Sequence, residues 1–348
     1  MVPNLADARI AAHAALAAIC LGLTACGEPA PDVRIYSGAT MGTTYRVSIA
    51  DEHADDETVA ITIEAELDEV NRRMSTWLDD SELSRFNASA STDWQPVSAS
   101  LCELIERALE ISADTDGAFD VTVLPLVDLW GFGAQGGVAE LPSTDAVAAV
   151  HRRTGYSKLA ADCGAPALRK TRGDLEVDLS AIAKGYGVDR VAERLDGLGF
   201  ENYLVEVGGE LRVRGAKAGG TPWRIGLERP EVGISAVQTG LELSDTGVAT
   251  SGDYRNYYEV DGERYSHTID PTTGAPVRHT TASVTVLAPL AVEADALATA
   301  LLVMGAEEGL SFAEARGIAA LFLDRRGSDI HARPTPAFTE IVRSSGRH

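Results

Sequence analysis

The stretch LEVDLSAIAKGYGVDRVAERLDGLGFENYLVEVGGELRVR, residues 175–214, decides the fold class of this sequence. Residues 175–179 have the pattern of a short strand, and residues 181–198 have that of a helix ending at a glycine. Two more strand patterns follow at 202–207 and 210–214. Helices mixed with closely spaced strands indicate an α+β domain with a largely antiparallel sheet.

The same mixture of patterns continues on both sides of this stretch. A strand signal rich in β-branched and aromatic residues lies within 33–49, and apolar residues recur at helical spacing over 63–74. Ser100 and Glu103 form the capping box of a further predicted helix. The sequence has no internal repeat and no clear second linker, so we expect a single composite catalytic domain over 33–348. Other strands are predicted at 223–228, 254–260, 282–288 and 318–323, and another helix at 291–304.

The first residues of the chain have the pattern of a bacterial export signal. Residues 10–23 form an apolar run too short to cross a bilayer comfortably and typical of a signal peptide. The run ends in Leu23-Thr24-Ala25-Cys26, which resembles a lipobox, where Cys26 is diacylated and becomes the mature N-terminus. We therefore expect a lipoprotein signal peptide over 1–25, a tether over 26–32 and a lipid anchor on the periplasmic side of a bacterial membrane. The alternative interpretation is a buried N-terminal helix.

The charge of the chain restricts its partners. Among 348 residues, 30 are Lys or Arg and 52 are Asp or Glu, which gives a formal net charge of -22. Nucleic-acid binding needs a basic surface that displaces counterions, so this class of partner is not expected. An anionic substrate must instead be met locally, by a metal ion, by backbone N–H groups or by a few placed cations.

The predicted mature domain keeps two cysteines with no assigned role, Cys102 and Cys163. An oxidising periplasm would allow them to pair, but two separate buried thiols are at least as consistent with the sequence. The sequence has no CxxC motif or Cys/His cluster that would indicate zinc.

Two polar clusters on predicted helices are candidates for chemistry. Asp295 and Thr299 are spaced i, i+4, so they share one helix face among leucines. A carboxylate near an apolar face needs a partner, and Asp and Thr offer the oxygen ligands that Mg²⁺ takes. Asp178 lies where a predicted strand gives way to a helix, and the stretch from Ser180 to Lys184 presents backbone N–H groups and one cation to an anionic ligand. The plainer interpretations are an exposed polar pair and an ordinary surface lysine.

A third candidate is His267, which precedes an Asp270-Pro271 turn. The ordinary pKa of a histidine, about 6.5, suits proton transfer near neutral pH. The plainer interpretation is a turn histidine, because Asp-Pro-x-x-Gly is ordinary turn chemistry.

Taken together, these segments resemble the ApbE family, the FAD:protein FMN transferases, in the right order from about Ser37 to about Leu302. The most specific strings are GAFDVTV at 117–123, LWGF at 129–132, DLSAIAKGY at 178–186, ATSGDY at 249–254 and HTIDPTTG at 267–274. The resemblance implies an ApbE-like α+β fold, related to the T-fold. The predicted lipoprotein signal fits it as well.

The resemblance also implies which residues form the site. FAD, as the substrate, would lie across Met41, Trp77, Ala118, Phe119, Asp120, Asp178, Lys184 and Ile269. Mg²⁺ would be held by the carbonyl of Ala181, by Asp295 and by Thr299. Some relatives carry a further aspartate where this chain has Ala298, and many carry tyrosine in place of Trp77, which keeps an aromatic ring for stacking.

The implied reaction transfers the FMN moiety of FAD to a Thr or Ser hydroxyl of a target protein, with AMP as the leaving group. Mg²⁺ would neutralise the pyrophosphate, and His267 is expected to take the hydroxyl proton, with Asp270 orienting it or acting as the base instead. The acceptors implied are electron-transfer complex subunits with a Ser/Thr-Gly-Ala-Thr-like site. Two alternatives stay open: a Mg²⁺-dependent FAD pyrophosphatase, and a flavin-binding lipoprotein without enzymatic activity.

Overall fold

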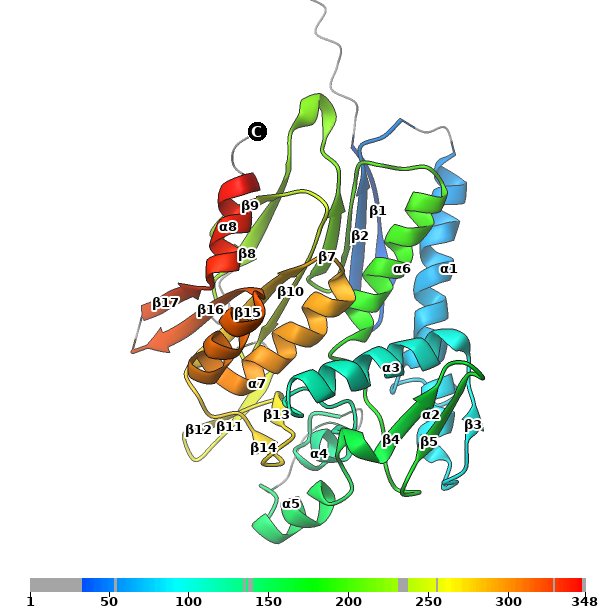
Figure 1. Cartoon of the computed structure of the whole chain (residues 1–348), viewed down its shortest axis with the longest axis vertical. Coiled ribbons are helices and arrows are strands. Elements are labelled where there is room, and N and C mark those ends of the chain that lie inside the picture. The colour runs from blue at the N-terminus through cyan, green and yellow to red at the C-terminus, as the bar shows by residue number, and fades with distance from the viewer. Residues whose placement is uncertain are drawn as a thin grey trace, which may run out of the picture.

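A computed structural model of the chain describes residues 33–345 except 53–54, 134–135, 137–139, 231–236, 255 and 328. The predicted signal peptide (1–25), the tether (26–32) and Cys26 lie outside the described residues. Figure 1 shows a mixed assembly of helices and strands.

The fold is built on one antiparallel sheet. Its strands follow in the spatial order β1 (Arg34–Thr40), β2 (Thr43–Ile49), β6 (Tyr203–Val207), β7 (Glu210–Arg214), β10 (Thr246–Gly252), β15 (Thr281–Ala288), β16 (Ala319–Arg326) and β17 (Asp329–Pro334). Each neighbouring pair is antiparallel. The expected α+β class with a largely antiparallel sheet is therefore confirmed.

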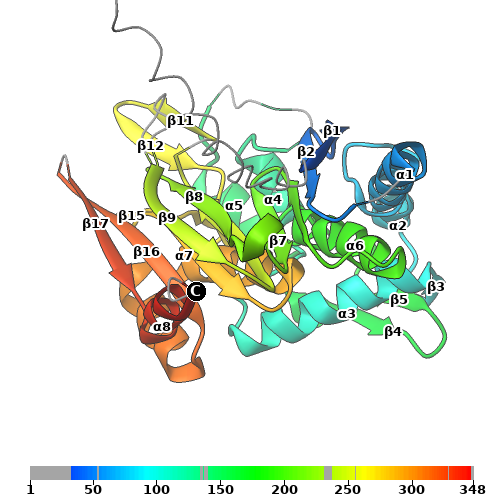
Figure 2. The ribbon, with the colours of Figure 1, turned by 90° about the horizontal axis from the view of Figure 1, so that it is seen from above.

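Both faces of this sheet are covered by other elements. The helical face carries α1 (Asp56–Met74), α6 (Ala183–Gly197) and α7 (Ala291–Arg316), and the opposite face carries β8 (Trp223–Glu228), β9 (Val237–Leu243) and α8 (Pro336–Ser345) (Figure 2). In β16, Phe322 packs with α7, whereas Leu321 and Leu323 pack with the β8–β9 pair and α8. Because side chains alternate between the faces of a strand, the part of β16 that is covered on both faces, residues 319–323, is apolar at every position.

A smaller layer of helices and short strands packs beside the main sheet (Figure 1). Its core surrounds α3 (Ala99–Asp114), whose residues Leu101, Leu104, Ile105 and Ala108 are buried as the helical spacing predicts. The other elements of this layer are α2 (Glu82–Ala88), α4 (Leu124–Leu129), α5 (Thr144–His151), the 3₁₀ helix η1 (Tyr156–Lys158), the sheet of β3 (Gln95–Pro96), β5 (Ala167–Lys170) and β4 (Leu159–Asp162), and the hairpins β11 (Tyr257–Val260) with β12 (Glu263–Ser266) and β13 (Ile269–Asp270) with β14 (Ala275–Pro276). A second 3₁₀ helix, η2 (Ala218–Gly220), lies in the connection between β7 and β8.

The long helix α7 is interrupted at Gly305. This glycine has a φ of 71° and a ψ of 175°, and a Cβ there would lie 2.7 Å from the ring of His279. The His279 Nε2–H donates to the carbonyl of Leu302, 2.7 Å away, which is one of the groups that a broken helix leaves unpaired. The predicted end of this helix at residue 304 coincides with the break. By length and composition alone α7 could cross a membrane, but 61% of its apolar stretch is buried inside the protein, as in a core helix.

Two local predictions are wrong. Residues 175–179 do not form a strand. The amide side chain of Asn87 bonds both the N–H and the carbonyl of Val177 at 2.8 Å, and so replaces a partner strand. The helix predicted from Ser100 begins at Ala99 instead, because Ser98 is its N-cap and accepts from the N–H of Leu101 at 3.3 Å.

Cys102 and Cys163 form a disulfide, with their Cα atoms 5.7 Å apart. The bond ties α3 to the turn between β4 and β5, 61 residues further along the chain. The chain-entropy model gives a loop of this size roughly 4 kcal/mol of stabilisation, because the cross-link restricts the unfolded chain.

We expect that the double variant Cys102→Ala/Cys163→Ala folds but is less stable than the wild type by about 2–4 kcal/mol. Thermal unfolding in the presence and absence of a reducing agent measures the difference. The reductant should lower the melting temperature of the wild type and leave that of the double variant unchanged. A wild type that is insensitive to the reductant would contradict the disulfide.

Candidate active site

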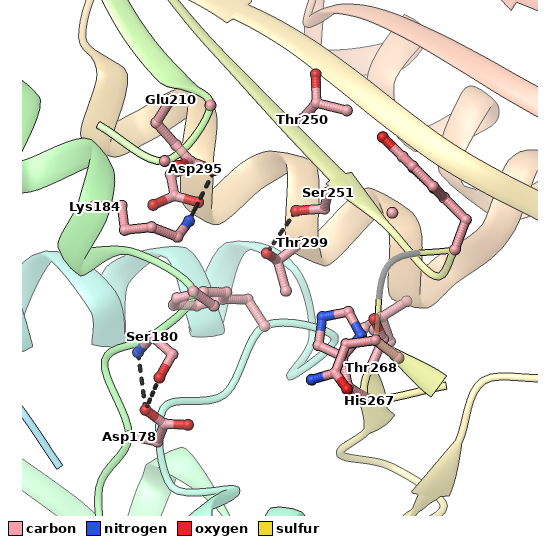
Figure 3. Close-up of a pocket in the computed structure, with 18 of the residues that line it drawn as sticks. Asp178, Ser180, Lys184, Glu210, Thr250, Ser251, His267, Thr268, Asp295 and Thr299 are labelled. Atoms are coloured by element: carbon pink, nitrogen blue, oxygen red, sulfur yellow. Dashed lines mark hydrogen bonds and ion pairs between the residues drawn. The ribbon is translucent and has the colours of Figure 1, made fainter. Parts of the chain in front are cut away.

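One cavity of about 680 Å³ gathers side chains from distant parts of the chain (Figure 3). Its walls come from the starts of α6 and β7, the end of β10, α7, β8, and the loops around Phe119 and His267. Most of the predicted site residues line it: Trp77, Ala118, Phe119, Asp120, Asp178, Ala181, Lys184, His267, Ile269, Asp295 and Thr299. The fold therefore brings together segments that the sequence keeps far apart.

The close approach of α6 and α7 holds one wall of the cavity in place. A Cβ at Gly185 would lie 2.4 Å from the carbonyl oxygen of Ala291, so only glycine lets the two helices meet there. The carboxylate of Asp189 accepts from the N–H groups of Ala291 and Val292 at 3.1 and 2.9 Å and so caps the start of α7. One turn further along α7, Asp295 reaches the beginning of α6.

Three charged side chains meet at this wall. Lys184 Nζ lies 2.8 Å from Oε1 of Glu210 and 3.8 Å from Oδ1 of Asp295, and Oδ2 of Asp295 accepts from the Gly185 N–H at 3.0 Å. Burial disfavours the charged form of Lys184, but the two carboxylates outweigh this effect and raise its pKa. Burial raises the pKa of Asp295, and it raises the pKa of Glu210 to about 7. The lysine is therefore held charged inside the cavity by its two acidic neighbours.

The oxygen donors on α7 fit a hard cation. Asp295 is only 2% exposed, and the hydroxyl of Thr299 lies 2.9 Å from that of Ser251 (Figure 3). Ala181 lines the same cavity. Within the described part of the chain, no three His, Cys, Asp or Glu side chains come together as a metal cage. Mg²⁺ is usually held by one or two carboxylates together with water and substrate phosphates, so this donor set suits Mg²⁺ better than a closed structural metal site.

Two aspartates, the buried Asp120 and the half-buried Asp178, shape the loops at the floor of the cavity. The carboxylate of Asp120 accepts from the N–H of Thr122 at 2.7 Å and from the N–H of Tyr156 at 2.8 Å. The carboxylate of Asp178 accepts from the N–H of Ser180 at 2.9 Å. Burial raises the pKa of both carboxyl groups, and these hydrogen bonds act in the opposite direction. Both aspartates therefore organise the backbone that lines the cavity.

The geometry around His267 fixes the tautomer of its ring. Nδ1 lies 3.0 Å from the carbonyl oxygen of Asn256, which also accepts from the backbone N–H of His267 at 3.1 Å. A carbonyl only accepts, so Nδ1 carries the proton and the neutral ring leaves Nε2 free to act as a base. Burial lowers the pKa of His267, while the bond to Asn256 raises it to a smaller extent. The lowered pKa keeps the imidazole neutral at pH 7, as a general base requires.

Two predicted site residues do not line the cavity. Met41 lies in the turn between β1 and β2 with a φ of 48°, and its side chain packs into the core. Asp270 uses its carboxylate to accept from the N–H of Thr272 at 2.8 Å and from the hydroxyl of Thr273 at 2.9 Å. This carboxylate organises the turn, so the geometry favours His267 over Asp270 as the base.

Other residues of the cavity were not identified from the sequence. Glu210, which is 4% exposed, follows the Gly208-Gly209 turn and holds Lys184. A glutamate at the start of a strand has no distinguishing spacing, and only the pair of glycines before it is a signal in the sequence. Ser251 contacts Thr299, and Asn256 contacts His267. Of these two residues, only Ser251 lies in the ATSGDY string.

The fold matches those of solved flavin transferases. The flavin transferase ApbE from Vibrio cholerae superposes with a TM-score of 0.83 at 43% identity, covering 90% of this chain and 100% of that chain. The apo form of the flavinyl transferase ApbE from Pseudomonas stutzeri superposes with a TM-score of 0.82 at 42% identity, covering 89% and 97% of the two chains. The fold is therefore that of the ApbE flavin transferases.

The sequence leads to the same family. The family model described as ApbE matches residues 41–322. The FAD:protein FMN transferase of Vibrio cholerae is 46% identical over 311 residues, which are 89% of this chain and 92% of that protein. The protein of the same name from Escherichia coli K12 is 39% identical over 316 residues, which are 90% of each chain. This chain belongs to the ApbE family.

Proposed function

We propose that this protein is an FAD:protein FMN transferase. The observation that carries the proposal is a single cavity that joins a histidine with a free Nε2, His267, to the buried donors Asp295 and Thr299 and to Lys184. The relatives from Vibrio cholerae and Escherichia coli, which bear this name and align along about nine-tenths of the chain, support it. FAD is the substrate, and the product is a flavinylated acceptor protein.

In this reaction a Ser or Thr hydroxyl of the acceptor attacks the phosphorus on the FMN side of FAD. A P–O bond forms to the hydroxyl oxygen, the P–O bond to AMP breaks, and AMP leaves with that electron pair. His267 Nε2 takes the hydroxyl proton, because Nδ1 is already committed to Asn256. Lys184 and the N-terminal end of α6 attract the pyrophosphate.

Asp295, Thr299 and the carbonyl of Ala181 would hold Mg²⁺ beside the pyrophosphate. When bound, Mg²⁺ neutralises phosphate charge and favours an in-line displacement. Lys184 and Glu210 complete this wall of the cavity, and their ion pair keeps the lysine oriented toward Asp295. Because Ala298 supplies no second carboxylate, the substrate phosphates and water must fill the remaining positions.

The test of this function is incubation of the purified domain with FAD, Mg²⁺ and a candidate acceptor that carries a Ser/Thr-Gly-Ala-Thr-like site. The proposal expects flavin fluorescence that stays with the denatured acceptor band on a gel. Free FMN and AMP with an unlabelled acceptor would indicate an FAD pyrophosphatase instead. Bound FAD that is never cleaved would indicate a flavin carrier.

We also propose that the protein is a lipoprotein on the periplasmic side of a bacterial membrane. The export signal and lipobox at Leu23-Thr24-Ala25-Cys26 support this location. The Cys102–Cys163 disulfide supports it independently, because disulfides persist in oxidising compartments and are rare in the cytosol.

Mass spectrometry of the mature N-terminus should find an acylated Cys26 after loss of residues 1–25. Substitution of Cys26 by Ser should release the protein from the membrane fraction, because the anchor is lost. The matched control is Cys20→Ser, which changes a cysteine of the signal peptide outside the lipobox. An intact N-terminus, or cleavage elsewhere without lipid, would contradict the anchor.

A further inference from the structure

The turn that follows β10 is held by two arginines from other elements. The carboxylate of Asp253 accepts two hydrogen bonds from the guanidinium of Arg325 on β16, at 2.6 and 2.8 Å. The carbonyl of Asp253 accepts from Arg264 on β12 at 2.8 Å, and its N–H donates to the carbonyl of Ala282 on β15 at 3.1 Å. Asp253 is 8% exposed, so this arrangement is partly shielded from water.

The same turn carries Asn256, whose carbonyl fixes the ring of His267. One oxygen accepts both the backbone N–H and Nδ1–H of that histidine. A shift of Asn256 would displace the imidazole ring of His267. It would also remove the hydrogen bond to Nδ1 that fixes the tautomer of the ring. The position of the base therefore depends on a turn whose clamped residue, Asp253, lies three positions before Asn256.

Asp253 also acts on His267 through its charge. Burial, the largest influence, lowers the pKa of His267. The carboxylate of Asp253 raises this pKa, and the charge of Lys184 lowers it. The charge of Arg325 opposes that of Asp253, because the two groups form a bidentate pair. Removal of either partner leaves a single uncompensated charge near the imidazole.

We propose that Asp253 and Arg325 are a positioning pair for His267: the clamp holds the carbonyl of Asn256 where it fixes the base and keeps the charge around the ring balanced. This inference rests on the proposed function, in which His267 takes the proton of the acceptor hydroxyl. Neither residue of the pair touches the reacting atoms.

The test compares Arg325→Met, Arg325→Lys and Asp253→Asn with the wild type under saturating FAD. Arg325→Met leaves Asp253 negative and unpaired, which stabilises the imidazolium; the acid limb of the kcat–pH profile should move up by about half a pH unit. Asp253→Asn leaves Arg325 positive, so the limb should move down by a similar amount.

Both variants should lose about 10-fold or more in kcat, because a misplaced base is costly, with FAD affinity within a few-fold of the wild type. Arg325→Lys keeps the charge and should recover part of the rate.

Arg333→Met is the matched control. Arg333 on the neighbouring strand β17 also pairs with a buried aspartate, Asp324, at 3.3 Å, but neither side chain bonds Asp253 or Asn256 in the described part of the chain. This variant should lose stability without a shift of the pH profile. An NMR titration of the His267 ring provides the same readout without turnover, and it serves for any folded variant whose transfer rate is too low to give a pH profile.

Shifts of the two pH profiles in the same direction, or no shift in variants that keep their fold, would overturn the positioning pair. Failure of the proposed function has a different result, since the wild type itself would then transfer no FMN to any acceptor. In that case the NMR titration still decides whether Asp253 and Arg325 control the ring of His267.

Discussion

Asp295→Asn is expected to reduce FMN transfer by at least about 100-fold while the protein stays folded. Even outer-shell partners of metal sites cost 10- to 100-fold when removed, and Asp295 is the one carboxylate in the proposed Mg²⁺ ligand set. The asparagine keeps an oxygen for the Gly185 N–H, so the α6–α7 contact should survive. Initial rates over a Mg²⁺ titration measure the effect, and excess Mg²⁺ should recover only part of it.

The matched control is Glu293→Gln, on the same helix two residues earlier. Glu293 is about one-third exposed and pairs with Arg107 at 3.5 Å, away from the cavity lining. It should keep a rate close to that of the wild type. Undiminished transfer by the wild type in excess chelator would remove the metal from the mechanism.

His267→Gln should slow transfer by roughly 10²–10⁴-fold, the usual cost of losing a general base. The neutral ring is the active form, so the wild-type rate should rise with pH and level off. Because burial lowers the pKa of His267, the midpoint of that rise should lie below 6.5. The variant should lose this limb of the profile and keep its affinity for FAD.

His331→Gln, an exposed histidine on β17, is the control for this substitution. Its profile should match that of the wild type. If His267→Gln turned over at a near-normal rate, or lost FAD binding in proportion to activity, His267 would be a binding residue. Asp270 would then need to be tested as the base, although its carboxylate is occupied within its own turn.

The regular parts of the fold could be predicted because their patterns are local. The alternation in β8 and the helical spacing in α3 are determined by which face each residue buries. The prediction was wrong at residues 175–179, where the side chain of Asn87, distant in sequence, supplies the hydrogen bonds of a neighbouring strand. No local pattern contains that information.

The candidate site, like the fold, has some residues that local patterns predict and others that depend on contacts between distant parts of the chain. Spacing alone was enough to place Asp295 and Thr299 on one helix face, and both line the cavity. The role of Glu210 depends on β7 lying beside α6, and the tautomer of His267 depends on the carbonyl of Asn256, whose residue type carries no signal. The groups that orient Lys184 and His267, a side chain in one case and a backbone carbonyl in the other, are therefore found from the fold, while the two oriented residues are visible in the sequence.

The most direct test of the proposed function is the intact mass of the acceptor after reaction, with AMP counted in the same sample. The proposed transfer predicts an acceptor heavier by one FMN phosphoester and one AMP released per modified acceptor, with no adduct when the target Ser or Thr is replaced by Ala. AMP released together with free FMN and an acceptor of unchanged mass would contradict it.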